Sequence, residues 1–168
     1  MIMPVLIGIP VLLLSLVIQT TAFSRLPLLY GTADIVMLVI LAWMLNERVK
    51  HGWEWVLMAG IMVSFVSALP FFTPLWGYLA AAGLSFWLKK RIWQSPVLAM
   101  LVSTFIGTMI MLLLSMVVLQ INGSAISTKE AFNLVILPSL LWNLILSIPV
   151  YSIINELVDW VYPDEVNV

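Results

Sequence analysis

The chain has no cysteine and little charge: only 9% of its 168 residues are Asp, Glu, Lys or Arg. The lack of cysteine excludes disulfides, thiolate nucleophiles and thiolate metal sites. The one histidine, His51, lies in a charged stretch without a second histidine or a paired carboxylate at ligand spacing, so it is a weak candidate for a metal site. A net charge of -1 gives no reason to expect a nucleic acid partner.

Catalytic motifs are missing as well. The sequence contains no HExxH, no P-loop and no glycine-rich nucleotide fingerprint. An intramembrane hydrolase would need a catalytic pair inside the membrane, which a lone histidine in a loop cannot supply. We therefore expect a protein that is not an enzyme and binds no cofactor.

Hydrophobic residues are abundant: they make up 63% of the chain, and the mean hydropathy is +1.14. A soluble fold of this composition would have too little polar surface to cover itself. Since a spanning helix needs roughly 20 apolar residues, the length fits about six spans in one membrane domain over residues 1–168. The fold class predicted is a compact all-α bundle of transmembrane helices, over residues 2–23, 28–45, 54–69, 74–88, 95–119 and 131–158.

The last apolar stretch, Ala131 to Pro163, carries polar residues and prolines along its length. Such residues are costly at membrane depth unless neighbouring helices satisfy them, so we expect this helix to be the most buried. Asn143 in particular should form a hydrogen bond to a neighbouring helix. Packing is the favoured interpretation, with direct functional contact as the alternative, for Pro138, Ser139, Asn143, Ser147 and Pro149.

Asp34 is the acidic residue that opens the second helix, in TADIVMLVILAWML. A carboxylate in the first turn suits the free amides and the positive end of the helix dipole, which favours a capping role. The functional alternative is a carboxylate that couples ion movement, because an ionisable residue at membrane depth is a site candidate by default.

Small residues recur every four positions in three of the predicted helices. This spacing lines them up on one helix face and lets two backbones approach closely. We interpret these faces as sites of helix packing or partner contact, and expect at least one to be left open for another protein. The residues are Gly60, Ser64 and Ala68, then Gly77, Ala81 and Ser85, then Ser103 and Gly107.

Basic residues divide unevenly between the two sides of a six-helix arrangement. Only Arg25 and Lys129 fall on one side, and lysine and arginine concentrate in cytoplasmic loops. The other side, with both termini, is therefore predicted to be cytoplasmic. Its topology anchors are Arg48, Lys50, Lys89, Lys90 and Arg91.

Five features together are typical of one family: the size, the helix number, Asp34, the segment GIMVSFVSALPFFTPLWGYLAAAGLSFWLKKR and the ending LLWNLILSIPVYSIINEL. In these features the chain resembles the bacterial rod shape-determining MreD family over most of its length. Pro149 and Tyr151 in that ending are further partner-contact candidates. Many family members have an acidic residue in the third helix. Here Ser64 or Ser67 stands in that region, so no role of that acid carries over.

The resemblance implies a multi-pass scaffold of the cell-elongation machinery in the bacterial inner membrane. It would bind an MreC-like bitopic protein, and would help to couple MreB filaments to a SEDS glycosyltransferase and its transpeptidase in peptidoglycan synthesis. The family is also similar to the six-helix substrate-binding components of energy-coupling vitamin transporters, which supply the alternative function. Against it, the loops predicted to face outward offer mainly aromatic residues, including Tyr30 and Trp76, and little charge for a hydrophilic ligand.

Overall fold

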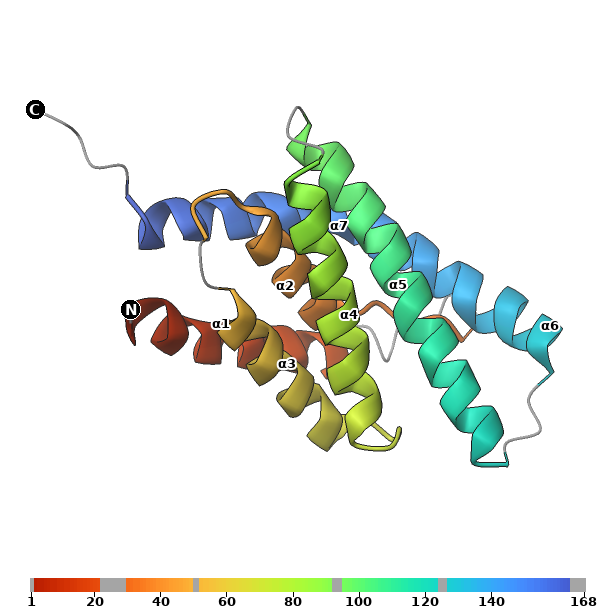
Figure 1. The fold of residues 1–168 in the computed structure, drawn as a ribbon. Helices are drawn as coiled ribbons and strands as arrows, with labels where there is room; N and C mark the ends of the chain where they lie inside the picture. Colours follow the sequence, from red (N-terminus) through yellow and green to blue (C-terminus); the bar gives the residue numbers. More distant parts are fainter. Residues whose placement is uncertain (1, 22–29, 50–51, 92–94, 124–126, 164–168) are drawn as a thin grey trace, which may run out of the picture.

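The structure is a computed structural model that describes the chain except for residues 1, 22–29, 50–51, 92–94, 124–126 and 164–168 (Figure 1). The described residues form helices and no β-strand, which confirms the all-helical class. The helices are α1 (Ile2–Thr21), α2 (Ile35–Leu45), α3 (Trp53–Val66), α4 (Phe72–Lys89), α5 (Pro96–Ile121), α6 (Thr128–Ala131), the π-helical turn η2 (Phe132–Ile136) and α7 (Leu137–Val161).

Three helical stretches are long and apolar enough to cross a bilayer, which indicates a membrane protein. They are Pro4–Thr21, Pro96–Ile121 and Lys129–Val161, the last formed by α6, η2 and α7 in one continuous rod. The helices α2 and α3 are apolar but shorter.

The centre of the molecule is α2, and α1, α3, α4, α5 and α7 all pack against it (Figure 1). Every residue of α2 is buried. The expectation that the last helix is the most buried is therefore wrong: α7 turns a row of large apolar side chains outward, including Ile145 and Ile153. The physical reason is that α7 has only one polar face to bury, along Ser139, Asn143 and Ser147, while the apolar side chains of its other face need no protein neighbour in lipid.

The predicted second helix also starts too early. Residues 30–34 are not helical, and α2 begins at Ile35. Residues 28 and 29 lie outside the described residues. The remaining helix bounds agree with the sequence prediction to within three residues at the ends that the structure describes.

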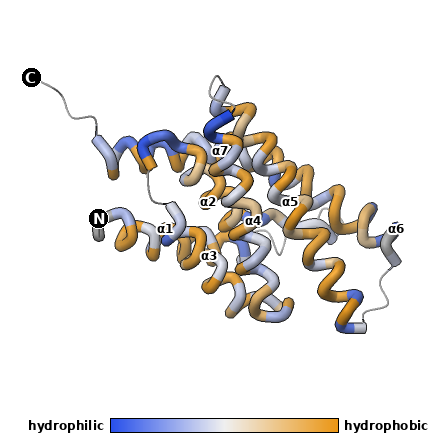
Figure 2. The backbone as a smooth tube through the Cα atoms, in the orientation of Figure 1, coloured by the Kyte–Doolittle hydropathy of each residue, from blue (hydrophilic) through white to orange (hydrophobic). Residues whose placement is uncertain are grey.

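Several helix ends meet at one end of the molecule. The indole Nε1 of Trp55, at the start of α3, donates to the carbonyl of Pro4 in α1 at 2.9 Å. The ring of Trp55 stacks on that of Trp43, with centroids 3.8 Å apart. Hydrophilic residues gather at this end, in the last turns of α4 and α7 (Figure 2). The turn between α3 and α4 and the end of α5 lie at the opposite end (Figure 1).

Candidate functional site

The segment from Tyr30 to Asp34 runs alongside the last helical rod and is fastened to it by its backbone. Alternate amides of this segment each donate a hydrogen bond to the rod, because side chains and amides of an extended chain alternate in direction. The bonds join Tyr30 N to the carbonyl of Leu134 at 3.1 Å, Thr32 N to Ser139 Oγ at 3.0 Å, and Asp34 N to Asn143 Oδ1 at 2.8 Å.

Pro138 explains the first of these bonds. In an α-helix the carbonyl of Leu134 would accept the amide hydrogen of residue 138, but proline has none. The π-helical turn at Phe132–Ile136 lies at this point, and the amide of Tyr30 donates to the carbonyl of Leu134. Pro138 thus leaves the Leu134 carbonyl without its α-helical donor, and a segment about a hundred residues earlier in the sequence supplies one.

Gly31 allows the segment to lie this close to the rod. A Cβ atom at this position would be 2.5 Å from both the backbone nitrogen of Ser139 and the Cβ of Pro138. Real Cβ contacts of this length do not occur, and the neighbour is backbone that cannot rotate away. The role of Gly31 is therefore to allow close backbone approach.

Asn143 links this segment to a further helix. Its Oδ1 accepts from the amide of Asp34, and its Nδ2 donates to Thr108 Oγ1 of α5 at 3.0 Å. Both side chains are buried. The prediction that Asn143 bonds a neighbouring helix is confirmed.

Asp34 caps α2, as the sequence predicted: its Oδ1 accepts from the amide of Met37 at 3.0 Å. The hydroxyl of Tyr78 in α4 donates to the same oxygen at 2.6 Å. Asp34 thus joins the start of the central helix to α4, while Asn143 joins it to α5 and α7. Together, the described polar groups form one network across four helices.

The glycines among the small residues pack within the chain. A Cβ on Gly60 would lie 2.7 Å from Leu75 Cδ1 of α4, and one on Gly77 would meet the sulfur of Met111 in α5. One on Gly107 would lie 3.3 Å from the Cβ of Ala81. The expectation that one of these glycine faces stays open for another protein is therefore wrong, because the chain's own helices cover them.

Two of the serines singled out beside these glycines, Ser64 and Ser103, are also internal. Ser64 is buried, and its hydroxyl donates to the carbonyl of Gly60 at 2.7 Å. Ser103 is fully buried on α5, and its hydroxyl has no hydrogen-bond partner among the described residues.

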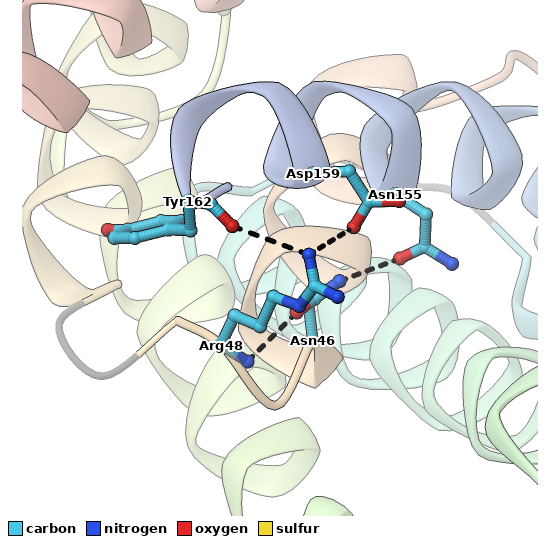
Figure 3. A network of polar contacts seen from close by, with 5 residues as sticks. All are labelled: Asn46, Arg48, Asn155, Asp159 and Tyr162. Carbon is cyan, nitrogen blue, oxygen red and sulfur yellow. Dashed lines mark hydrogen bonds and ion pairs between the residues drawn. The ribbon is translucent and has the colours of Figure 1, made fainter. Parts of the chain in front are cut away.

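The predicted topology anchors that the structure describes include Arg48, which lies at the opposite end of α2 and pairs with Asp159 at 2.9 Å (Figure 3). Arg48 also donates to the backbone carbonyl of Tyr162 at 3.3 Å. Burial raises the pKa of the Tyr162 phenol and the negative charge of Glu54 acts in the same direction, so this group stays protonated at neutral pH. Two amide contacts extend the network, from Asn46 Nδ2 to Asn155 Oδ1 at 3.0 Å and from Arg48 N to Asn46 Oδ1 at 3.0 Å.

The lysines at the end of α4 differ in their surroundings. Lys89 donates to the carbonyls of Asn46 and Val49, so it closes the C-terminal end of α2. Lys90 lies over the ring of Phe86 with its nitrogen 4.7 Å from the centroid. The guanidinium carbon of Arg91 lies 5.3 Å from the centroid of the Trp87 ring. Lys50 and His51 fall outside the described residues.

The two remaining candidates lie on α7. Tyr151 lines a cavity of about 300 Å³ at the charged end, together with Arg48, Lys89 and Asp159. Pro149 is exposed on the outer face of the helix. Among the described residues, no three His, Asp or Glu side chains come together as metal ligands would.

Three further hydrogen-bonding residues were not singled out from the sequence: Tyr78, Thr108 and Gln19. The side-chain Oε1 of Gln19 accepts a hydrogen bond from the amide of Val36 at 3.0 Å. Gln19 could have been found, because an amide inside an apolar span is itself a signal.

Comparison with protein-family models, with curated proteins and with solved structures finds no match for this chain.

Proposed function

We propose that the chain is a six-span, non-enzymatic scaffold of the bacterial cell-elongation machinery, of the MreD type, in the inner membrane with both termini cytoplasmic. The span count is supported by a length argument at α2. Eleven helical residues cover roughly 16 Å, and five extended residues before them cover about as much again. Together they match a hydrocarbon core of about 30 Å.

An apolar groove on the side of the molecule carries the proposal. Toward their ends, α5 and α6 diverge (Figure 1). Between them lies a groove of about 110 Å³, lined mainly by apolar side chains such as Leu112, Leu119, Val135 and Ile136. Nearby on α5, Val117 and Ile121 are exposed. Without a hydrophobic force between helices in lipid, a groove of this kind favours close packing with a further helix.

The polar groups give complementary support. Asn143, Asp34, Tyr78 and Thr108 bond one another and the backbone, so much of their hydrogen-bonding capacity is already used within the chain. The partner we propose is an MreC-like bitopic membrane protein, with MreB and the SEDS glycosyltransferase and its transpeptidase as indirect partners. The choice of these partners rests on the family resemblance.

Co-purification with an MreC-like single-span protein tests the proposal. Leu119→Trp and Val135→Trp would each fill the groove, and we expect both variants to fold but to lose the partner. Leu13→Trp, on the exposed face of α1, is the control and should retain it. A parent protein that does not co-purify with the partner would contradict the proposal.

A vitamin-binding component of a transporter is the second candidate. The observation in its favour is a second cavity of about 260 Å³, lined in part by Gln19, Thr32 and Asp34. This volume is at or below the lower limit of about 300 Å³ usual for small-molecule sites. Mass spectrometry of the molecules released from the denatured protein distinguishes the two candidates. One vitamin molecule released per protein chain would favour the transporter component.

A further inference from the structure

The cavity beside Asp34 lies where four parts of the chain meet at the end of the molecule away from the Arg48–Asp159 ion pair. They are the last turns of α1 and α3, the middle of α5 and the extended segment before α2. The cavity holds about 260 Å³, room for several waters, since one water takes roughly 30 Å³. Its polar lining residues are Gln19, Thr32, Asp34, Ser67 and Ser115.

Asp34 is the only ionisable residue that lines this cavity among the described residues. Both of the hydrogen bonds its side chain accepts, from Met37 N and from the hydroxyl of Tyr78, reach Oδ1. Within the described chain, Oδ2 accepts no hydrogen bond and Asp34 forms no ion pair. A carboxylate at this depth without a positive partner is costly, so a cation that enters the cavity lowers its energy.

The other polar atoms suit a cation too. The hydroxyl of Ser115 donates to the carbonyl of Met111 at 2.7 Å, which leaves its oxygen lone pairs able to accept. Ser67 Oγ already accepts from the amide of Leu69 at 3.1 Å, so it has one lone pair fewer to offer a cation than Ser115 has. No lysine, arginine or histidine among the described residues lines the cavity to attract an anion instead.

We propose that this cavity binds one small monovalent cation, with Asp34 Oδ2 as the charged ligand and the hydroxyls of Thr32 and Ser115 as neutral oxygen ligands. Alkali ions and small protonated amines share this chemistry, and both fit the volume. The cation site does not depend on the proposed scaffold function, because cation binding and partner co-purification are measured separately and either can fail without the other.

The test measures thermal unfolding of the full chain in detergent at constant ionic strength. Lithium, sodium, potassium and methylammonium chlorides each replace N-methyl-D-glucamine chloride, whose bulky organic cation serves as the reference. We expect at least one cation to raise the Tm saturably, because it binds the folded state alone. The panel also shows whether the occupant is a metal ion or an amine.

Asp34→Asn should abolish this rise while it retains the helix cap, because asparagine caps helices as well as aspartate does. Glu156→Gln removes an exposed carboxylate of α7 and should leave the rise unchanged. If Asp34→Asn does not fold, Ser115→Ala should weaken the apparent affinity several-fold, and equilibrium dialysis of the labelled cation measures it directly. A parent Tm that is the same in every chloride, or a rise that persists in Asp34→Asn, would overturn the proposal.

Discussion

At the scale of single residues, two groups fix the start of the central helix: a glycine without a side chain and an amide that bonds in two directions. Gly31 brings the extended segment against the rod, and Asn143 holds both that segment and α5. Polar residues in the rod were recognisable from sequence as packing residues. The groups that they bond could not be recognised from the sequence. These groups are backbone amides of Thr32 and Asp34, more than a hundred residues away, and a backbone amide has no sequence signal.

Replacing Gly31 with alanine should destabilise the protein by about 1–3 kcal/mol, because the new methyl group would press on the backbone of Ser139. Gly83→Ala is the matched control, since a Cβ there would meet only Trp53 at 3.8 Å. In the interior of α4, alanine should be neutral or stabilising by up to about 1 kcal/mol. Unfolding by denaturant in mixed micelles measures both, and equal effects of the two substitutions would refute the close approach.

Asn143→Leu should lower stability by about 1–2 kcal/mol, because it removes two hydrogen bonds and such bonds are each worth about 0.6 kcal/mol on average in membranes. Asn133→Leu, at an exposed position of the same rod, should change stability little. The same unfolding assay compares them. If the Asn143 variant were as stable as the parent but lost its partner protein, direct functional contact would replace packing as the role of this residue.

At the scale of elements, the chain is organised around α2 and not around the last helix. Hydropathy and length predicted where helices form, because apolar runs must pair their backbone internally in lipid. They could not rank burial, since lipid-facing and protein-facing apolar residues have the same composition. The polar residues of α7 indicated one buried face, but its other face carries Ile145 and Ile153 outward.

Alanine substitutions on the two helices test this order of burial. Ile40 in α2 is fully buried, whereas Ile153 in α7 is 64% exposed. Ile40→Ala should leave a cavity that costs about 2 kcal/mol or more, and Ile153→Ala should cost well under 1 kcal/mol because lipid replaces the lost contacts. Reversed magnitudes in the unfolding assay would restore the last helix as the core.

At the scale of the whole molecule, the ends of α2, α4 and α7 meet through Arg48, Lys89 and Asp159. Two of the positive charges that the sequence assigned to one side, Arg48 and Lys89, therefore lie close together. This clustering was predictable because the positive-inside rule depends only on loop composition. The cavity beside Asp34 was not, since it needs Gln19, Thr32 and Ser115 from three separate segments. Asp34 itself was recognised from sequence, both as a cap and as a possible ion site.

Reporter fusions test the arrangement in the membrane. A reporter active only in the cytoplasm should be active after Arg91 and after Val168, and silent after Gly123, because the proposed topology puts the basic residues Arg48 and Lys89 on the cytoplasmic side. The decisive fusion is the one after Gly31. A silent reporter there requires the chain to cross the membrane between Gly31 and Arg48, and only α2 together with its extended approach is available for that crossing. An active reporter at Gly31 would mean that α1 and α2 do not both span, and the network around Asp34 and Asn143 would then have to lie at the membrane surface.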